Sequence, residues 1–191
     1  MKCILCENLS HTHICKSCQD TFLTPSLYKR QLSDSTQVIS FYKYSDIKEL
    51  LHTKHTDLGY HIYKLLAQLS FKKFAEEFEM EDQAVSIAID DNISSGYSHT
   101  AILNHSLKSQ NIKPLHSKLR ANNSVSYSGK SLHFRLTNPR NFTIKKFTQK
   151  SVILVDDIIT TGTTLSQALS LMKKKNKDVL FCLTLADARL K

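Results

Sequence analysis

The chain has little of what interrupts regular structure, with only four glycines and three prolines in 191 residues. A composition this poor in both residues argues against a low-complexity chain. No apolar run approaches the roughly 18–20 residues that a membrane span requires, and no internal repeat is present. Because 41% of the residues are hydrophobic, the length suffices for one well-packed domain and a small additional segment.

Negative charge is absent from the middle of the chain. Residues 92–155 contain no Asp or Glu, yet the same 64 residues hold ten of the 26 Lys and Arg residues. The rest of the chain has 16 basic and 17 acidic residues, so the net charge of +9 comes from this acid-free window. The uneven distribution favours a polyanionic partner, with an ordinary lysine-rich surface as the alternative. The ten cations are Lys108, Lys113, Lys118, Arg120, Lys130, Arg135, Arg140, Lys145, Lys146 and Lys150.

The segment 152–165, VILVDDIITTGTTL, combines an apolar run, two carboxylates and a loop of small residues. The β-branched run predicts a buried strand. Asp156 and Asp157 cannot both follow it into the core, because unpaired buried charge is too costly, so we expect them to face a site. Residues 160–164 then lead into a predicted helix, where backbone N–H groups can bind an anion. An ordinary turn with a capped helix is the alternative interpretation.

Four of the five cysteines have the spacing of a metal site. They form two Cys-x-x-Cys turns, Cys3 with Cys6 and Cys15 with Cys18. Each turn presents two sulfur atoms to one tetrahedral ion, which predicts zinc bound by four thiolates.

Two alternatives to zinc bound by these four cysteines stay open. His11 or His13 in the intervening loop could replace one thiolate, although the spacing favours four cysteines. The other alternative is two disulfides, but the polar N-terminus does not resemble a signal peptide, so we expect a reducing compartment. The fifth cysteine, Cys182, lies in an apolar run and is expected in the core.

Apolar periodicity predicts strands that alternate with helices. Strands are expected at residues 38–44, 84–89, 112–118, 151–155 and 179–186. Helices are expected at 46–78, 98–109 and 163–173, whereas 21–36 has the composition of a linker and 121–143 shows no clear periodicity.

This alternation predicts an α/β fold, with a parallel sheet that has helices on both faces. We expect a zinc finger at residues 1–24 and the α/β domain at 37–191. Ligands of such folds bind at the carboxyl ends of the strands. Asp90 and Asp91 end one predicted strand, so they either reach that crevice or cap a turn, and we favour the cap.

The segment 152–165 resembles, nearly residue for residue, the signature with which type I phosphoribosyltransferases bind 5-phosphoribosyl-1-pyrophosphate (PRPP). The resemblance implies that the two aspartates hold the ribose hydroxyls, that the loop wraps the 5′-phosphate, and that Mg²⁺ bridges pyrophosphate and ribose. Lys54 and Arg135 are candidates for binding the pyrophosphate. The implied PRPP contacts are Lys54, Asp156, Asp157, Ile158, Thr160, Thr161, Gly162, Thr163 and Thr164.

The order of the parts, a four-cysteine segment before a phosphoribosyltransferase-like domain, resembles the ComF (ComFC) family of bacterial natural transformation. Smaller likenesses lie at residues 50–54, Gly96-Tyr97, Arg120, and Arg135-x-x-Asn138 followed by Phe142. The family pattern is weaker in the middle, where Ser95 and Ser98 replace an Arg and an Asn.

The resemblance implies a cytoplasmic factor that binds PRPP and handles single-stranded DNA during uptake. Its partner would be a DNA-uptake helicase or a recombination mediator. The implied role is also compatible with peripheral association of the protein with the membrane. The candidate DNA contacts are Arg120, Lys130, Arg135, Arg140, Lys145 and Lys146. Base stacking or core packing is expected of Tyr97, Tyr127, Phe134, Phe142 and Phe147.

Two other functions fit the same pattern. The first is an active phosphoribosyltransferase that transfers the ribose phosphate of PRPP to a nucleobase. The second is an interaction module that senses PRPP without turnover. The sequence shows no recognisable base-binding segment and no obvious general base beyond the acidic pair, so it does not decide among them.

Overall fold

The computed structural model describes residues 1–90, 96–122, 137 and 140–190. Its centre is a seven-stranded sheet with the order β1-β2-β7-β6-β3-β4-β5. The five inner strands are parallel, and β1 and β5 pair antiparallel at the two edges. The strands are β1 (Tyr28–Gln31), β2 (Gln37–Lys43), β3 (Ala84–Asp90), β4 (Ile112–Ala121), β5 (Phe142–Ile144), β6 (Ser151–Ile159) and β7 (Asp178–Asp187).

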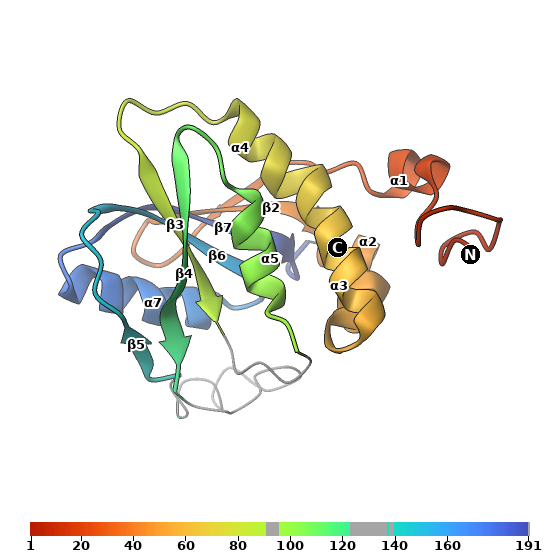
Figure 1. The fold of residues 1–191 in the computed structure, drawn as a ribbon. Coiled ribbons are helices and arrows are strands. Elements are labelled where there is room, and N and C mark those ends of the chain that lie inside the picture. The colour runs from red at the N-terminus through yellow and green to blue at the C-terminus, as the bar shows by residue number, and fades with distance from the viewer. Residues whose placement is uncertain (91–95, 123–136, 138–139, 191) are drawn as a thin grey trace.

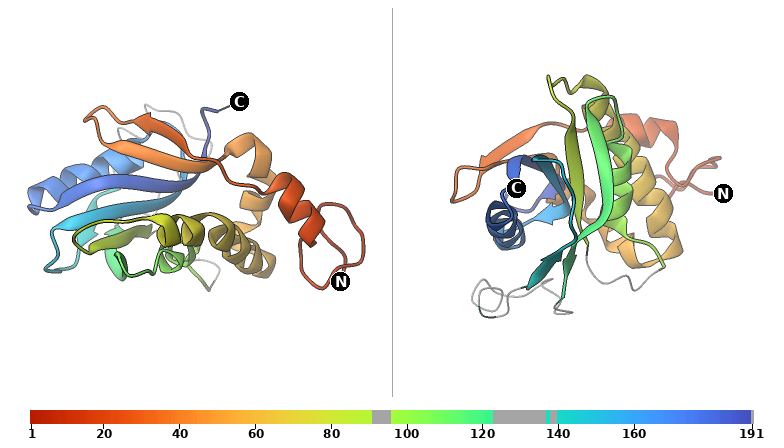
Figure 2. Two further views of the ribbon diagram at one scale, coloured as in Figure 1. Left: turned by 90° about the horizontal axis from the view of Figure 1, so that it is seen from above. Right: turned by 60° about the vertical axis from the view of Figure 1, so that its left-hand side comes forward.

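Helices cover both faces of the sheet, as Figures 1 and 2 show, which confirms the α/β fold expected from the sequence. Helix α7 (Thr163–Lys174) lies on one face. The other face carries α2 (Tyr44–Leu51), α3 (Asp57–Ala67), α4 (Lys73–Glu77) and α5 (His99–Ser106). In the part of the chain that the structure describes, no helix is both long and apolar enough to span a bilayer.

The central strand β6 is buried on both faces, and this explains its unbroken apolar run. Val152 and Leu154 belong to the apolar cluster under α7, whereas Ile153 and Val155 belong to the cluster under α3 and α5. Successive side chains of a strand point to opposite faces. The same alternation continues into Asp156 and Asp157, so the two carboxylates leave the strand in opposite directions.

The N-terminal segment packs against the helical layer and extends from one end of the molecule (Figure 2). It contains the short helix α1 (Lys16–Phe22). Ile14 and Leu23 are fully buried in the cluster that also holds Tyr63 of α3. The hydroxyl of Tyr42 in β2 donates a hydrogen bond to the Leu23 carbonyl (2.9 Å). This segment is therefore joined to the α/β domain by apolar packing as well as by the chain.

Two sequence-based expectations about regular structure were wrong. Residues 28–31 of the expected linker form β1, which pairs with β2 through a hairpin. Four residues are too few for their periodicity to reveal a strand. The expected helix 46–78 is divided into α2, a 3-10 turn (His52–His55), α3, a π-helical turn (Gln68–Lys72) and α4. Thr56 caps α3 by accepting the Gly59 N–H (3.2 Å), a local bond that apolar spacing does not reveal.

Candidate functional site

The carboxyl ends of the parallel strands bring together side chains from distant parts of the sequence. Asp156 and Asp157 lie within β6, which extends four residues beyond its predicted end. The 3-10 turn after α2 contributes Lys54, and the start of α5, after β3, contributes His99. The strand ends thus form one site, as expected for an open parallel sheet.

Asp157 is the paired carboxylate of the site. Its Oδ2 lies 3.2 Å from Lys54 Nζ and 3.2 Å from His99 Nε2, and its Oδ1 accepts the Ile158 N–H (2.8 Å). The residue is only 8% exposed. Burial acts to raise its pKa, but Lys54 and His99 outweigh burial and hold the pKa below its ordinary value. Asp157 therefore stays ionised at neutral pH.

Asp156 has a different environment on the other face of the sheet. Its Oδ1 accepts the Asp157 N–H (2.9 Å), and the positive charge of Arg140 is close enough to stabilise it in part. Burial and the neighbouring Asp157 carboxylate together raise the pKa of Asp156. The pair therefore consists of one firmly ionised group and one that takes up a proton more readily.

The loop at residues 160–164 turns sharply into α7. Gly162 is the residue before the helix and has a φ of +85°, which favours glycine. A Cβ at this position would lie 2.6 Å from Leu32 Cδ2, so a larger residue would displace the end of the Leu32 side chain. The hydroxyls of Thr161 and Thr163 lie 2.9 Å apart, and the Ser166 N–H donates to the Gly162 carbonyl (2.9 Å). The loop therefore places small polar side chains at the N-terminus of a 12-residue helix.

Lys54 is held in place by contacts of its own backbone. The Tyr97 hydroxyl donates to the Lys54 carbonyl (2.7 Å). Gly59 of α3 packs so closely here that a Cβ would overlap the Thr53 carbonyl oxygen and the Tyr97 hydroxyl. Glycine at this position thus allows α3 to lie against the segment that carries Lys54.

Beside this ion pair lies Tyr63, whose side chain is fully buried. Its ring centre is 5.4 Å from that of His99. Its hydroxyl has no hydrogen-bond partner among the described residues. Burial, followed by the charge of Asp157, raises the pKa of Tyr63 well above its ordinary value, so the hydroxyl stays protonated.

The four cysteines of the N-terminal segment form a compact cluster. The sulfur atoms of Cys3, Cys6, Cys15 and Cys18 all lie within 4.8 Å of one another, and those of Cys6 and Cys15 are 3.7 Å apart. All are free thiols, which argues against two disulfides. A tetrahedral ion with Zn–S bonds of about 2.3 Å separates its sulfurs by about 3.8 Å. The cluster therefore suits zinc, and neither His11 nor His13 belongs to it.

The candidate DNA contacts fall into three groups. Arg120, Lys145 and Lys146 lie exposed on or next to the paired strands β4 and β5, and Lys145 donates its N–H to the Lys118 carbonyl (2.8 Å). Arg140 is instead partly buried near the two aspartates, and burial lowers its pKa. The remaining candidates, Lys130 and Arg135, lie outside the described residues, as do Tyr127 and Phe134.

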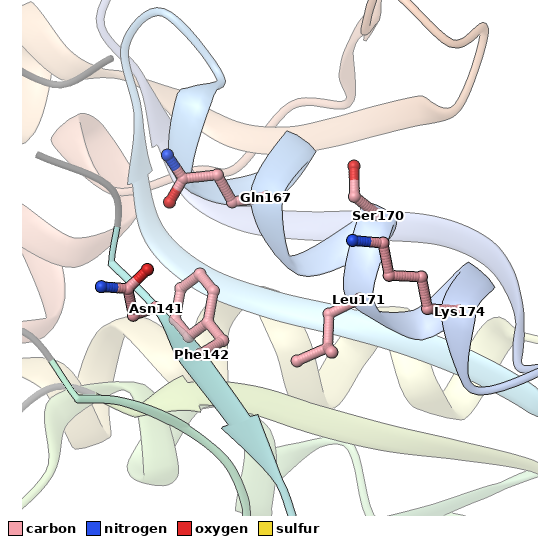
Figure 3. A pocket seen from close by; sticks show the side chains of 6 residues that line it. All are labelled: Asn141, Phe142, Gln167, Ser170, Leu171 and Lys174. Atoms are coloured by element: carbon pink, nitrogen blue, oxygen red, sulfur yellow. The ribbon is translucent and has the colours of Figure 1, made fainter. Parts of the chain in front are cut away.

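A pocket of about 260 Å³ lies between β5 and α7 (Figure 3). It is lined by Asn141, Phe142, Gln167, Ser170, Leu171 and Lys174. Phe142 also packs against the apolar cluster under α7, and so does Phe147, whose ring lies 4.2 Å from Lys177 Nζ. Core packing, the alternative expectation for these aromatics, is therefore part of their role. The expected core position of Cys182 is confirmed in the same cluster.

Sequence reasoning missed several residues of the site. His99 and Arg30 carry no motif, and each reaches its partner only through the fold. One weak signal was available for His99, since Ser98 caps α5 by accepting the Ala101 N–H (3.1 Å) and so places His99 at the helix start. The expectation that Asp90 and Asp91 cap a turn falls outside the described part of the chain, because Asp91 and the side chain of Asp90, the last residue of β3, are not described.

Comparison with known proteins finds a family model that matches the second part of the chain. Residues 123–190 match the family described as "Phosphoribosyl transferase domain". No curated protein matches the chain. The matched segment contains β6, both aspartates, the 160–164 loop and α7.

Several solved phosphoribosyltransferases are similar to the chain at low identity. A hypoxanthine phosphoribosyltransferase from Staphylococcus aureus is 15% identical over 65% of this chain and 62% of its own, with a TM-score of 0.40. An orotate phosphoribosyltransferase from Aeropyrum pernix is 17% identical over 90% of this chain and 80% of its own, with a TM-score of 0.38. The alignment spans less than two thirds of the first protein. Because both TM-scores are below 0.5, the fold is assigned from the strand pairing described above and not from these structures. The similarity of residues 123–190 to a phosphoribosyltransferase-type domain rests on the family match.

Proposed function

We propose that the carboxyl edge of the sheet binds PRPP. The observation that carries this proposal is the sequence of strand, acidic pair, small-residue loop and helix in one continuous unit, with Lys54 and His99 placed beside Asp157. PRPP has a ribose, a phosphate and a pyrophosphate, and the site offers carboxylates, backbone N–H groups and a cation for these three parts. The match of residues 123–190 to the phosphoribosyl transferase domain supports the same ligand.

In this proposal each part of PRPP has its own residues. Asp156 and Asp157 accept hydrogen bonds from the ribose hydroxyls, and the 160–164 loop binds the 5′-phosphate through N–H groups and threonine hydroxyls. Lys54 would leave Asp157 for the pyrophosphate, since a flexible lysine can reach a second anion nearby. His99 would remain in contact with Asp157.

The donor set also suits Mg²⁺. Carboxylate and phosphate oxygens are the hard ligands that this ion prefers, and Asp156 and Asp157 are the residues that would hold it. When bound, Mg²⁺ would offset the charge of the pyrophosphate.

Calorimetry with PRPP in the presence of Mg²⁺ tests the binding proposal directly. We expect one PRPP per chain, and wild-type protein that shows no binding would refute the site. Release of pyrophosphate from PRPP with a panel of nucleobases tests the alternative, an active phosphoribosyltransferase. Turnover with any base would favour the enzyme, whereas binding without turnover would favour a PRPP-sensing role.

A second proposed function is binding of single-stranded DNA through the acid-free window, in bacterial natural transformation. The observation that favours it is the exposed group of Arg120, Lys145 and Lys146 on or next to the paired strands β4 and β5, the second of which also carries Phe142. Cations that follow a phosphate backbone and an aromatic that can stack on a base are typical of single-strand binding.

The four-cysteine segment ahead of a phosphoribosyltransferase-type domain supports the same role, because ComF-like proteins have this order of parts. In that role the protein acts in the cytoplasm, beside a DNA-uptake helicase or a recombination mediator. Co-purification with DNA-uptake components, and transformation frequency in a strain that lacks the chain, test it. Normal transformation in that strain would refute the role.

A further inference from the structure

We propose that Arg30 is a positioning residue of the PRPP site and that it sets the direction of the Thr161 N–H group. The inference rests on the PRPP site proposed above and names the residue that prepares its phosphate loop. Arg30 comes from β1, outside the region 37–191 that the sequence assigns to the α/β domain. It lies 130 positions from Thr160, whose carbonyl it binds.

The guanidinium of Arg30 joins two segments. Its Nη2 donates to the Thr160 carbonyl oxygen (2.8 Å), and its Nη1 lies 3.2 Å from Asp187 Oδ1. The side chains of Arg30 and Asp187 are only 15% and 5% exposed. Asp187 is itself fixed, because its Oδ1 accepts the Arg189 N–H (2.9 Å). The Arg30 side chain therefore holds the loop against the end of β7.

The contact with the Thr160 carbonyl determines where the next N–H group points. A trans peptide unit is planar, and its C=O and N–H point in opposite directions. Since the described chain contains no cis peptide, the Thr161 N–H points away from Arg30. A charged donor on the carbonyl also polarises the peptide unit, which makes its N–H a better donor to a phosphate.

The same hairpin supports the loop by packing. Leu32, just after β1, is buried against the cluster under α7, and its side chain fills the space where a Cβ of Gly162 would lie. Arg30 and Leu32 thus contact two successive parts of the loop, the Thr160 carbonyl and Gly162. Strand β1 is therefore part of the phosphate site and not only an edge strand of the sheet.

The test compares two probes in the full-length protein with Arg30→Ala. Ribose 5-phosphate reports on the loop, and pyrophosphate reports on the Lys54 side of the site. We expect the variant to bind ribose 5-phosphate at least tenfold more weakly and pyrophosphate within twofold of wild type. Lys173→Gln is the matched control, because it removes an ion pair between α7 and Asp34 in the same hairpin (2.9 Å) without touching the loop.

A second measurement does not need a ligand. The Thr161 amide proton should shift upfield in the NMR spectrum of Arg30→Ala and of Arg30→Lys, because its peptide loses the guanidinium contact. Unchanged ribose 5-phosphate affinity, or an equal loss of both probes, would overturn the inference. If wild type binds neither probe, the proposed PRPP site fails, and an unshifted Thr161 amide would then overturn the role of Arg30 separately.

Discussion

The cysteine cluster and the carboxyl edge of the sheet are assembled in opposite ways. The cluster takes its four sulfurs from one stretch, residues 3–18, so its ligands are already close in the sequence. The carboxyl edge joins Lys54 to Asp157 across 103 positions, and it requires the whole sheet to do so. A metal can organise the first region, because binding and folding of short metal sites are coupled. Only the packed domain can organise the second.

The largest expected effect separates the two regions by removing the metal site. Cys15→Ser with Cys18→Ser should abolish zinc binding, which in zinc-finger peptides is worth about 10–16 kcal/mol. The loops between the cysteines should then lose their ordered amide signals, because the ion no longer holds them together. Ile14 and Leu23 should keep part of their packing, because they lie in the core that the segment shares with the α/β domain. The sheet should remain folded. Elemental analysis and NMR spectra of the purified protein measure both effects.

Cys182→Ala is the control for this variant, because Cys182 is also buried but lies in the α/β domain. It should keep a full equivalent of zinc. Wild-type metal content in the double variant, or wild-type protein without stoichiometric metal, would contradict the site.

The next effect acts on the carboxyl edge of the sheet and leaves the cysteine cluster intact. Asp156→Ala with Asp157→Ala removes the acceptors proposed for the ribose hydroxyls, at about 1–3 kcal/mol for each unmet polar group. PRPP affinity should therefore fall at least tenfold, while the zinc content stays unchanged. Asp178→Ala, at the opposite end of β7, should bind PRPP as wild type does. Calorimetry that finds equal affinity in the double variant would refute the assignment.

A smaller effect distinguishes the two aspartates from each other. At pH 7, Asp157→Asn should lower the free energy of unfolding by about 1–3 kcal/mol, because it leaves Lys54 and His99 without their carboxylate. At pH 9, Asp156→Asn should raise it by about 1 kcal/mol, because it removes a carboxylate whose charged form is disfavoured. Urea unfolding at several pH values measures both.

The pH dependence of these effects follows from the two pKa shifts. The lowered pKa of Asp157 means that its contribution is present above the unfolded value near 4 and is lost as the pH falls through the folded pKa. The raised pKa of Asp156 means that its cost is largest at high pH and disappears as the pH falls. Effects of the same sign in the two variants would contradict the contrast between the carboxylates.

The smallest effect tests the exposed cations on or next to β4 and β5, which belong neither to the cysteine cluster nor to the carboxyl edge of the sheet. Lys145→Glu with Lys146→Glu should make the salt dependence of single-stranded DNA binding shallower by about 1.4, at 0.7 per phosphate contact on a log–log plot. Lys64→Glu with Lys73→Glu makes the same charge change on exposed residues of the helical layer and should leave the slope nearly unchanged. Fluorescence anisotropy over a salt series measures the slope. Equal slopes in the two variants would show that Lys145 and Lys146 make no contact with the DNA phosphates.

The sequence alone determined the features that depend on near neighbours. The cysteine spacing, the strand that leads to Asp156 and Asp157, and the helix after Gly162 could all be predicted, because each is fixed by residues a few positions apart. The extension of β6 through the acidic pair could not, since carboxylates after an apolar run give no sign of further strand pairing. Its pairing with β7 through Ile159 supplies that continuation.

Only the tertiary structure decided which side chains reach the acidic pair and its loop. The sequence marks Lys54 as a candidate only through a family resemblance, and no motif marks His99 or Arg30 as a neighbour of β6. Parallel strands are joined by long crossovers, so residues that meet at their carboxyl ends have no fixed spacing in the sequence. Arg30 and Asp187 meet across 157 positions because β1 and β7 flank the same strand, β2, and that order exists only once the sheet has formed.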